Sequence, residues 1–415
     1  MGTVREQAEQ ARRAARRLAP LGRAQKDAAL TAIASRLREQ VATIGEANAR
    51  DIESGRAGGL SSAMLDRLVM GPRQIETTAR GVEEIRELTD PVGSRREMRR
   101  LPNGLLLGRE RLPLGVVAMV YESRPNVTVD AAALCLKSGN AVLLRGGKEA
   151  AHTNAILGSV IREALAATEV PADSVQIVPA TDRESVREML SLADLIDVAI
   201  PRGGPGLIRF VAENARVPVV KHYQGVCHMF LDAGCDVEMA TRLVDNAKTQ
   251  RPGVCNALEC LLVHADAAAS VLPRVGQRLT EAGVLLRGCA QARQILPGIQ
   301  EATDEDWGTE YLDLVLAVRV VPDLDAALDH VARYGSNHTE AICTNNYQHA
   351  QRWLREVDAS CVMVNASTRF NDGGQFGLGA EIGISTSKLH AYGPMGLESL
   401  TTEKWIVIGD GQVRS

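Results

Sequence analysis

Alternating strand-like and helix-like segments, which begin at Gly115, constrain the fold of this 415-residue chain more than any other feature. The strand-like runs are short, aliphatic and rich in β-branched residues, and they cover Gly115–Tyr121, Ala141–Leu144, Ser174–Val178, Leu195–Ile200 and Val217–Val220. The helical stretches between them cover Val127–Leu136, Glu149–Ala167, Arg183–Leu192 and Gly206–Ala215. Alternation at intervals of roughly 20 to 35 residues is typical of βαβ units around a parallel sheet.

The same pattern starts again after Gly225. The second set of runs covers His228–Leu231, Leu258–Val263, Leu314–Val321, Ala341–Thr344 and Cys361–Val364. Helical stretches such as Ala265–Leu279 and Leu324–Ala332 lie between them. We therefore expect two consecutive α/β domains with a crevice between them.

The two ends of the chain differ from this alternation. The first hundred residues have helical periodicity, clearest in Leu18–Val41. Asn103-Gly104 lies between the apolar stretches of Met98–Gly108 and predicts a β-hairpin with a type I′ turn, since that turn needs positive φ at both central residues. Trp405–Gly409 predicts one more strand. Because an isolated hairpin is marginally stable, we expect the hairpin and this strand to pair with each other or with another subunit.

Composition excludes two classes of protein. Lys and Arg number 47 against 51 Asp and Glu, a net charge of −4 that gives no global basic field for nucleic acid. The aromatic residues are 3 Trp, 6 Tyr and 4 Phe, too few to suggest stacking platforms for single strands. The longest charge-free apolar run, Leu112–Tyr121, is far shorter than the ~20 residues that cross a bilayer. We expect neither nucleic-acid binding nor a membrane span.

The cysteines indicate a reducing compartment. Eight of them are scattered along the chain without a Cys-x-x-Cys pair, so we expect neither a zinc ribbon nor a dithiol redox site, and no metal. The N-terminus mixes charges, as in Arg5 and Glu6, and has no apolar segment typical of a secretory signal. Both features predict a cytoplasmic protein.

Cys255 is the strongest candidate nucleophile. It follows the turn Arg251-Pro252-Gly253 and precedes the strand at Leu258–Val263. A thiol on a turn can be partly exposed and electropositive, as a nucleophile requires. The alternative is a buried structural cysteine, but Cys255 is the one cysteine of the sequence in a Pro-Gly turn.

Asn126 is the second candidate. It ends the segment Tyr121-Glu122-Ser123-Arg124-Pro125-Asn126, where a strand passes into a helix, and ligands of open α/β sheets bind beyond such strand ends. Its amide could donate to a developing oxyanion. The alternative is that Asn126 caps the helix.

Two glycine-containing strand ends could hold cofactor phosphates. Arg145-Gly146-Gly147-Lys148 and Arg202-Gly203-Gly204 each combine cations with glycines that allow close backbone approach. Neither is a G-x-G-x-x-G motif, and a solvated turn is at least as consistent with either spacing.

Two later loops are candidate binding segments. His338 lies among polar residues of Tyr334–Glu340, which predicts a loop position rather than the core, with a binding-site and a structural role equally open. Arg369 lies in the glycine-rich loop Asn365–Gly379, and its guanidinium suits a carboxylate. The alternative for this loop is a mobile surface segment.

Taken together, four motifs resemble the glutamate-5-semialdehyde dehydrogenase (γ-glutamyl phosphate reductase) family, within the aldehyde dehydrogenase superfamily, over essentially the whole length. They are Tyr-Glu-Ser-Arg-Pro-Asn at 121–126, Gln-Arg-Pro-Gly-Val-Cys-Asn at 250–256, Ser-Asn-His-Thr-Glu at 336–340 and Asn-Ala-Ser-Thr-Arg-Phe at 365–370. The resemblance implies two Rossmann-like α/β domains with parallel sheets and a small β oligomerisation flap. It assigns 1–97 and 115–224 to an NADP-binding domain, 225–395 to a catalytic domain, and 98–114 with 403–415 to the flap.

The resemblance also implies an activity: reduction of L-glutamyl 5-phosphate to L-glutamate 5-semialdehyde in proline biosynthesis, through a thioester on Cys255 with Asn126 at the oxyanion. Glu310, in Gly308-Thr-Glu-Tyr311, matches the ribose-binding glutamate of the superfamily. Cofactor contacts are implied for Arg145, Gly146, Gly147, Lys148, Arg202, Gly203 and Gly204 as well as Glu310. Residue type and loop position make Arg124, His338 and Arg369 candidates for holding the charged groups of the substrate, and Ser123, His222 and Ser367 are further substrate-binding candidates.

Two departures from the wider superfamily sharpen this expectation. Its oxidising members carry a glutamate that activates water, whereas Val217–Gly225 contains no acid, as suits a reductase that must not hydrolyse its thioester. Lys148 occupies a position that is often acidic in NAD-using relatives, and a cation there favours the 2′-phosphate of NADPH.

One alternative enzyme is a CoA-acylating aldehyde dehydrogenase, which also lacks the water-activating glutamate. An alternative of another class is a silent partner of glutamate 5-kinase, but nucleophile and cofactor loops are both retained. A homo-oligomer and a transient contact with that kinase are further expectations.

Overall fold

The computed structural model describes residues 2–179, 182–221 and 224–414. The chain divides into two compact units. The first unit comprises Met1–Lys221, Leu378–Gly383 and Met395–Ser415, and the second comprises His222–Gly377 and Ile384–Pro394. Each unit contains a parallel sheet covered by helices, so the α/β fold with parallel sheets predicted from the alternating pattern is confirmed.

The sheet of the first unit has four parallel strands in the order β5-β4-β3-β6. Their bounds are Val116–Tyr121 for β3, Ala141–Arg145 for β4, Val175–Ile177 for β5 and Val198–Arg202 for β6. Every residue of β3 and β4 is buried, as expected of parallel strands covered on both faces. All four carboxyl ends lie at one edge, which brings Tyr121, Arg145 and Arg202 to the same side of the sheet.

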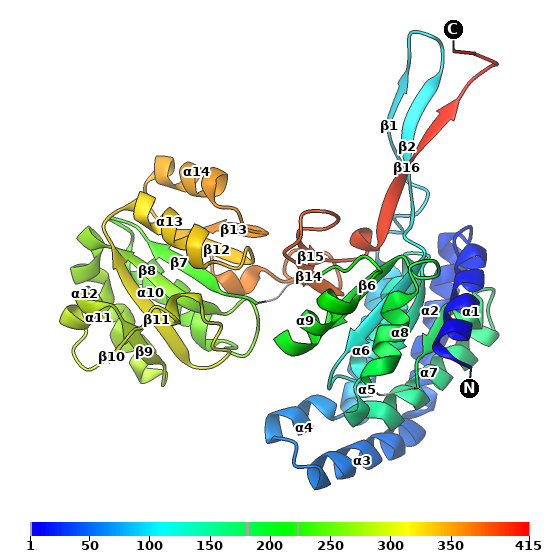
Figure 1. Cartoon of the computed structure of the whole chain (residues 1–415), viewed down its shortest axis with the longest axis horizontal. Helices are drawn as coiled ribbons and strands as arrows, with labels where there is room; N and C mark the ends of the chain where they lie inside the picture. The colour runs from blue at the N-terminus through cyan, green and yellow to red at the C-terminus, as the bar shows by residue number, and fades with distance from the viewer. Residues whose placement is uncertain (1, 180–181, 222–223, 415) are drawn as a thin grey trace. The chain divides into compact units, whose positions relative to one another are not determined.

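The described residues of this unit form nine helices (Figure 1). They are α1 (Val4–Leu18), α2 (Arg23–Glu39), α3 (Val41–Ala57), α4 (Ser62–Leu68), α5 (Pro72–Glu87), α6 (Asn126–Lys137), α7 (Ala151–Ala166), α8 (Arg183–Ser191) and α9 (Pro205–Asn214). Helix α1 begins with a capping box between Thr3 and Glu6 and buries Ala8, Ala11 and Ala15 at helical spacing. The helical prediction for the first hundred residues is confirmed up to Glu87.

The predicted hairpin and terminal strand form a three-stranded antiparallel arm that projects from the first unit (Figure 1). It consists of β1 (Arg95–Arg100), β2 (Leu106–Pro113) and β16 (Thr401–Ile408), and β2 pairs with both neighbours. The hairpin and its pairing with the tail are confirmed, but the type I′ turn is wrong. Gly104 has φ 88° whereas Asn103 is not left-handed, and the Leu101 and Leu105 main chains pair around a three-residue loop.

The second unit has a seven-stranded parallel sheet in the order β10-β9-β11-β8-β7-β12-β13. The strands are β7 (Cys227–Leu231), β8 (Leu258–His264), β9 (Leu285–Gly288), β10 (Gln300–Glu301), β11 (Val315–Val321), β12 (Thr339–Cys343) and β13 (Cys361–Val364). The helices are α10 (Val237–Thr249), α11 (Ala265–Glu281), α12 (Ala290–Ile295), α13 (Leu324–Tyr334) and α14 (Tyr347–Glu356). Short strands β14 (Gly383–Ser385) and β15 (Gly393–Met395) pair where the chain passes between the units.

The predicted strand at Val217–Val220 is wrong as a full strand. Val219 makes a single isolated bridge to Ala199, and the chain leaves the sheet at Lys221. Strands β9 and β10 were not predicted, because they are very short and Leu285, Gln300 and Glu301 are exposed.

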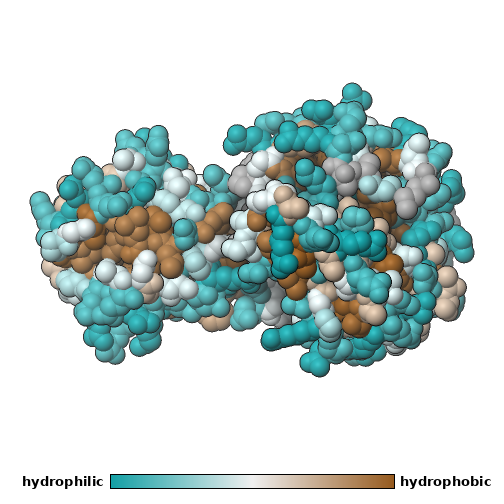
Figure 2. Space-filling model, turned by 90° about the horizontal axis from the view of Figure 1, so that it is seen from below, coloured by the Kyte–Doolittle hydropathy of each residue, from teal (hydrophilic) through white to brown (hydrophobic). Residues whose placement is uncertain are grey.

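Polar residues dominate the face of the molecule drawn in Figure 2, and hydrophobic residues reach that surface in patches. Among the described residues, no helix is both long and apolar enough to cross a membrane.

Candidate functional site

The turn that carries Cys255 lies between α10 and β8. Cys255 is half-buried, whereas five of the other seven cysteines are buried, so it is one of three partly exposed thiols with Cys289 and Cys361. None of the eight cysteines is in a disulfide. The alternative that Cys255 is a buried structural cysteine is wrong.

Two neighbours fix the main chain of Cys255. The thiol of Cys227 donates to the Cys255 carbonyl oxygen, with 3.2 Å between Sγ and O. Gly225 packs against the same peptide so closely that a Cβ there would lie 1.9 Å from the Cys255 oxygen. Cys227 is fully buried, and burial raises the pKa of its thiol well above the usual value, so it acts here as a neutral donor. A glycine at 225 is required by this close approach.

Arg369 lies on the other side of this turn. Its Nε donates to Gln250 Oε1 at 2.8 Å, and its guanidinium also donates to the side-chain oxygen of Asn256. Burial lowers the pKa of Arg369, with Arg251 adding to the effect. Arg369 is therefore a cation held in place by Gln250 and Asn256, two residues close to Cys255 in the sequence. Ser367 lies behind it and is buried, where its hydroxyl accepts from the Arg369 backbone N–H at 3.3 Å.

His338 lies in a loop, as predicted, but the expectation that it lies outside the core is wrong. Its side chain is fully buried just before β12, with Nδ1 2.7 Å from Thr339 Oγ1 and 3.8 Å from Cys227 Sγ. Asn371 donates to the same Thr339 hydroxyl at 2.6 Å. His338 thus belongs to a buried polar group, and one of the polar neighbours that suggested a loop, Thr339, is hydrogen-bonded to it.

Glu310 lies in the same unit and is half-buried. It is hydrogen-bonded to the backbone of Gly225, the glycine that packs on Cys255, and burial raises the pKa of its carboxyl group. The structure therefore connects the predicted ribose-binding carboxylate to the nucleophile turn through a single residue.

The first candidate phosphate loop follows β4 in the first unit. Gly146 and Gly147 are buried, and a Cβ at either would lie 2.1 Å from a side-chain atom, that of Asn154 for Gly146 and that of Glu149 for Gly147. Arg145 turns inward and donates to the Asp182 carbonyl at 2.8 Å, while burial lowers its pKa. Lys148, in contrast, is exposed. Of the two cations, Lys148 is the one placed to meet a ligand from solvent.

The second candidate loop follows β6. Gly203 and Gly204 are exposed, and Gly204 is the N-cap of α9, so its neighbouring N–H groups lie at a helix N-terminus suited to an anion. Glu122 Oε2 accepts from the Gly204 N–H at 2.9 Å, and Arg202 lies 3.5 Å from Glu381. The glycines of both loops carry no side chain that would keep a dinucleotide from the main chain, and Lys148 adds an exposed cation, so the residues present fit such a cofactor.

Asn126 is the first residue of α6, and Pro125 occupies the N-cap, so the capping alternative is wrong. Its Nδ2 donates to Asp130 Oδ2 at 2.9 Å, which orients the amide and leaves one N–H to donate elsewhere. Burial raises the pKa of Asp130 to about 6, although the Asn126 hydrogen bond opposes this.

Ser123 lies three residues before Asn126 and has a left-handed φ of 47°, and its N–H and hydroxyl both donate to Glu149 Oε1. Arg124 is exposed, and His222 lies outside the described residues.

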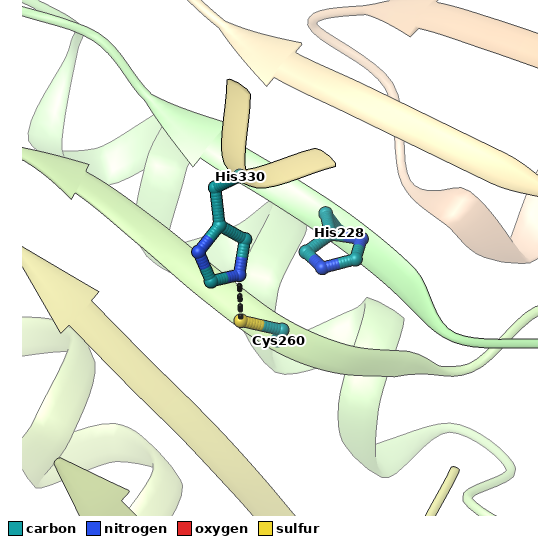
Figure 3. A group of neighbouring side chains, drawn as sticks. All are labelled: His228, Cys260 and His330. Carbon is teal, nitrogen blue, oxygen red and sulfur yellow. Dashed lines mark hydrogen bonds between the residues drawn. The ribbon is translucent and has the colours of Figure 1, made fainter. Parts of the chain in front are cut away.

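Sequence analysis predicted no metal, yet the fold brings His228, Cys260 and His330 together from β7, β8 and α13 (Figure 3). All three are buried, and their potential ligand atoms lie within 4.8 Å of one another. Arg319 donates to His330 Nδ1 at 2.8 Å, so Nε2 bears the hydrogen and faces Cys260 Sγ at 3.6 Å. Because that nitrogen is a donor, the group fits a hydrogen-bonded core cluster better than a metal centre.

The two histidines of this cluster have opposite charge preferences. Burial opposes protonation of His228, but Glu340, 3.0 Å from its Nδ1, raises the pKa to about 10. Burial lowers the pKa of His330 to about 3, and His228 and Arg319 add to the effect. The cluster is thus one charged His228–Glu340 pair beside a neutral His330.

The sequence did not predict the residues that pack against or hydrogen-bond the site residues. They are Gly225, Cys227, Asn256, Asn371 and the buried pair Lys248–Glu259. Glu259 alone carried a signal, because it is a carboxylate inside the apolar run Leu258–Val263. The others come together only through pairing between distant segments.

Comparison with known proteins agrees with this geometry. The chain belongs to the aldehyde dehydrogenase family of oxidoreductases, whose model matches residues 2–305.

Within that family, the most similar proteins compared are named γ-glutamyl phosphate reductase. The protein from Sorangium cellulosum is 62% identical over 100% of this chain and 98% of its own length, and that from Desulfatibacillum aliphaticivorans is 56% identical over 99% of both chains. The crystal structure of γ-glutamyl phosphate reductase from Thermotoga maritima matches with a TM-score of 0.99 at 45% identity and 100% coverage of both chains. An acetylating aldehyde dehydrogenase from Geobacillus thermoglucosidasius, at 17% identity and a TM-score of 0.70, shares the fold.

Proposed function

We propose that this chain reduces L-glutamyl 5-phosphate to L-glutamate 5-semialdehyde and phosphate with NADPH, the second step of proline biosynthesis from glutamate. The observation that carries the proposal is the geometry of the Cys255 turn. The Cys255 thiol is half-buried, and the Cys227 thiol donates a hydrogen bond to the Cys255 carbonyl oxygen. Arg369 is held close to this turn by its hydrogen bond to Gln250. Full-length similarity to proteins named for this reaction supports the choice of substrate.

In the proposed reaction the Cys255 thiolate attacks the acyl carbon of the substrate. A C–S bond forms, the bond to the phosphate oxygen breaks, and phosphate leaves with the electron pair. Asn126 and the Cys255 backbone N–H donate to the oxyanion of the tetrahedral intermediate, as preorganised donors do in acyl transfer. Arg369 and Arg124 bind the anionic groups of the substrate.

NADPH would be held by Lys148, the glycines of the two strand-end loops and Glu310. When bound it supplies the hydride that reduces the thioester to the level of the aldehyde. The exposed Lys148 favours a cofactor with a 2′-phosphate. The stretch Val217–Gly225 contains no carboxylate to activate water, which protects the thioester from hydrolysis.

The proposed enzyme is a homo-oligomer of the cytoplasm. On β16, Trp405, Val407 and Ile408 are each more than half exposed, and exposed apolar strands of this kind are typical of interfaces. None of the eight cysteines forms a disulfide, which suits a reducing compartment. A transient contact with glutamate 5-kinase, which makes the unstable substrate, completes the proposal.

The reverse reaction tests this function. Glutamate 5-semialdehyde, NADP⁺ and phosphate are mixed with enzyme, and NADPH is followed by absorbance. We expect phosphate-dependent NADPH formation that disappears in Cys255→Ala, since replacing a nucleophile removes up to about 10⁶-fold of kcat. Activity that needs CoA and ignores phosphate would assign the chain to the acylating enzymes instead. Inactivity of the wild type would contradict the proposal.

A further inference from the structure

A buried ion pair, Lys248–Glu259, connects the helix before Cys255 to the strand after it. Lys248 lies near the end of α10 and Glu259 on β8, and both side chains are almost completely inaccessible to solvent. The distance from Lys248 Nζ to Glu259 Oε2 is 2.6 Å. The mechanism proposed above does not use either residue.

The second oxygen of Glu259 holds the loop that carries Glu310. Glu259 Oε1 accepts from the backbone N–H of Leu312 at 3.2 Å. Leu312 has φ 55°, a left-handed conformation that is strained for leucine and persists only when its surroundings fix it. Two residues earlier, Glu310 is hydrogen-bonded to Gly225, which packs on the Cys255 peptide.

Tyr311, between Glu310 and Leu312, is held by a separate contact with Asp306. The Tyr311 hydroxyl donates to Asp306 Oδ1 at 2.6 Å, and Arg287 donates to the same carboxylate at 2.7 Å. Lys248 Nζ lies 6.0 Å from the centre of the Tyr311 ring. Tyr311 and Leu312 are therefore each fixed, and the acceptor that fixes Leu312 is Glu259 Oε1.

Electrostatics give Lys248 a second effect. Burial raises the pKa of Glu259 to about 7, Lys248 opposes this, and the charge of Glu310 raises it further. The buried Glu259 and the half-buried Glu310 are thus close enough to repel each other. The Lys248 cation favours the ionised form of Glu259.

We propose that Glu259, whose buried charge Lys248 neutralises, is a positioning residue for the cofactor: it fixes the left-handed main chain at Leu312 so that the Glu310 carboxylate is held beside the Cys255 turn, ready to accept hydrogen bonds from the ribose hydroxyls of NADPH. The inference rests on the proposed function, because the role of Glu310 is part of it.

Two double variants of equal charge separate the effect of the Leu312–Glu259 hydrogen bond from that of the Lys248–Glu259 ion pair. Lys248→Met with Glu259→Gln removes both charges but keeps an acceptor for the Leu312 N–H. Lys248→Met with Glu259→Leu removes both charges and the acceptor. A neutral, well-packed replacement for a buried ion pair is tolerated by many folds, so we expect both variants to fold. Arg278→Gln, which breaks the exposed pair of α10 Asp245 with α11 Arg278, is the control.

The measurements are NADPH binding by fluorescence titration, KM and kcat, and a thermal melt for each variant. We expect the Gln variant to stay within about threefold of wild type and the Leu variant to raise the Kd and KM for NADPH by about tenfold, a usual size for coupled neighbours, with kcat changed far less. Adding Glu310→Ala to the Leu variant should weaken binding little further, because both changes act through the same carboxylate.

Equal Kd and KM in the Gln and Leu variants, with wild type active, would overturn the positioning role and leave the proposed function intact. A parallel loss of kcat and melting temperature in the Leu variant alone, without a change in KM, would overturn it in favour of a purely structural role. A wild type that neither binds nor oxidises the cofactor would overturn the proposed function and this inference together.

Discussion

The nucleophile turn of the second unit and the strand-end loops of the first unit are both glycine-containing, but they are held in different ways. At Gly225 the nearest atoms to an added Cβ are the main-chain atoms of Cys255. At Gly203 the nearest atoms belong to the side chains of Glu122 and Leu207, which can rotate away. The nucleophile is therefore fixed by main chain, whereas the loops proposed for the cofactor are lined by adaptable side chains. Covalent chemistry needs placement within a fraction of an ångström, and dinucleotide binding tolerates more.

Asn126→Ala gives the largest effect expected from a single change outside Cys255. Losing one oxyanion donor typically lowers kcat by about 10²–10³-fold, and the fold should persist because Pro125 rather than Asn126 caps α6. Steady-state rates of the reverse reaction measure this loss. Asp130→Asn is the control, because it keeps an acceptor for the Asn126 amide, and a loss equal to that of Asn126→Ala would contradict the direct role of Asn126.

Gly225→Ala and Gly203→Ala test the contrast itself. The first places a Cβ 1.9 Å from the Cys255 oxygen and must shift the nucleophile, so we expect a fall in kcat of about 10²-fold. The second meets Glu122 Oε2 at 2.4 Å, a movable atom, and should stay within a few-fold of wild type in kcat. The kcat of each variant measures this difference, and a thermal melt confirms that both variants fold. Equal losses at the two positions would remove the distinction between the regions.

Lys148→Ala sharpens the account of the cofactor loops. Because the exposed Lys148 cation is proposed to meet the 2′-phosphate, its loss should raise the KM for NADPH by about tenfold and leave the KM for NADH unchanged. Lys404→Ala, which removes an exposed cation from the arm, is the matched control. A parallel rise for both cofactors would place Lys148 away from the 2′-phosphate.

His330→Gln has the smallest expected effect, on stability rather than rate. The folded pKa of His330 is about 3, well below the unfolded value of 6.5, so the unfolded state binds the proton first as pH falls. Stability is therefore lost between pH 6.5 and 3, with His330 contributing at most about 1.4 kcal/mol per pH unit. Urea unfolding at pH 7.5, 6.0 and 5.0 should show a shallower loss in His330→Gln. An identical slope in both proteins would contradict a neutral His330.

The sequence predicted most of the fold, because buried parallel strands are apolar and β-branched over their whole length. Where that signal was weak, prediction failed: Val217–Val220 looks like a strand but makes one bridge, and β9 and β10 are too short and exposed to stand out. The turn type at Asn103 was wrong because a three-residue loop needs positive φ only at Gly104.

The sequence pointed to the half-buried residues of the candidate site, but not to the buried residues that hold them in place. Cys255 and Arg369 carry local signals, a Pro-Gly turn and a glycine-rich loop. The polar neighbours of His338 predicted a position outside the core, yet the side chain is buried and lies against Thr339 and Cys227. The contacts of Gly225 and Cys227 with Cys255, and the Glu259 bond to Leu312, join segments far apart in sequence, so no local pattern could reveal them.

The central claim is that Cys255 forms the thioester, and trapping that intermediate tests it most directly. Enzyme is mixed with glutamate 5-semialdehyde and NADP⁺ without phosphate, quenched in acid to keep the amine protonated, and mapped by peptide mass spectrometry. The account predicts a glutamyl adduct on the Cys255 peptide alone, absent from those of Cys289 and Cys361, which disappears when phosphate is added before the quench. An adduct on another residue, or turnover with none, would contradict it.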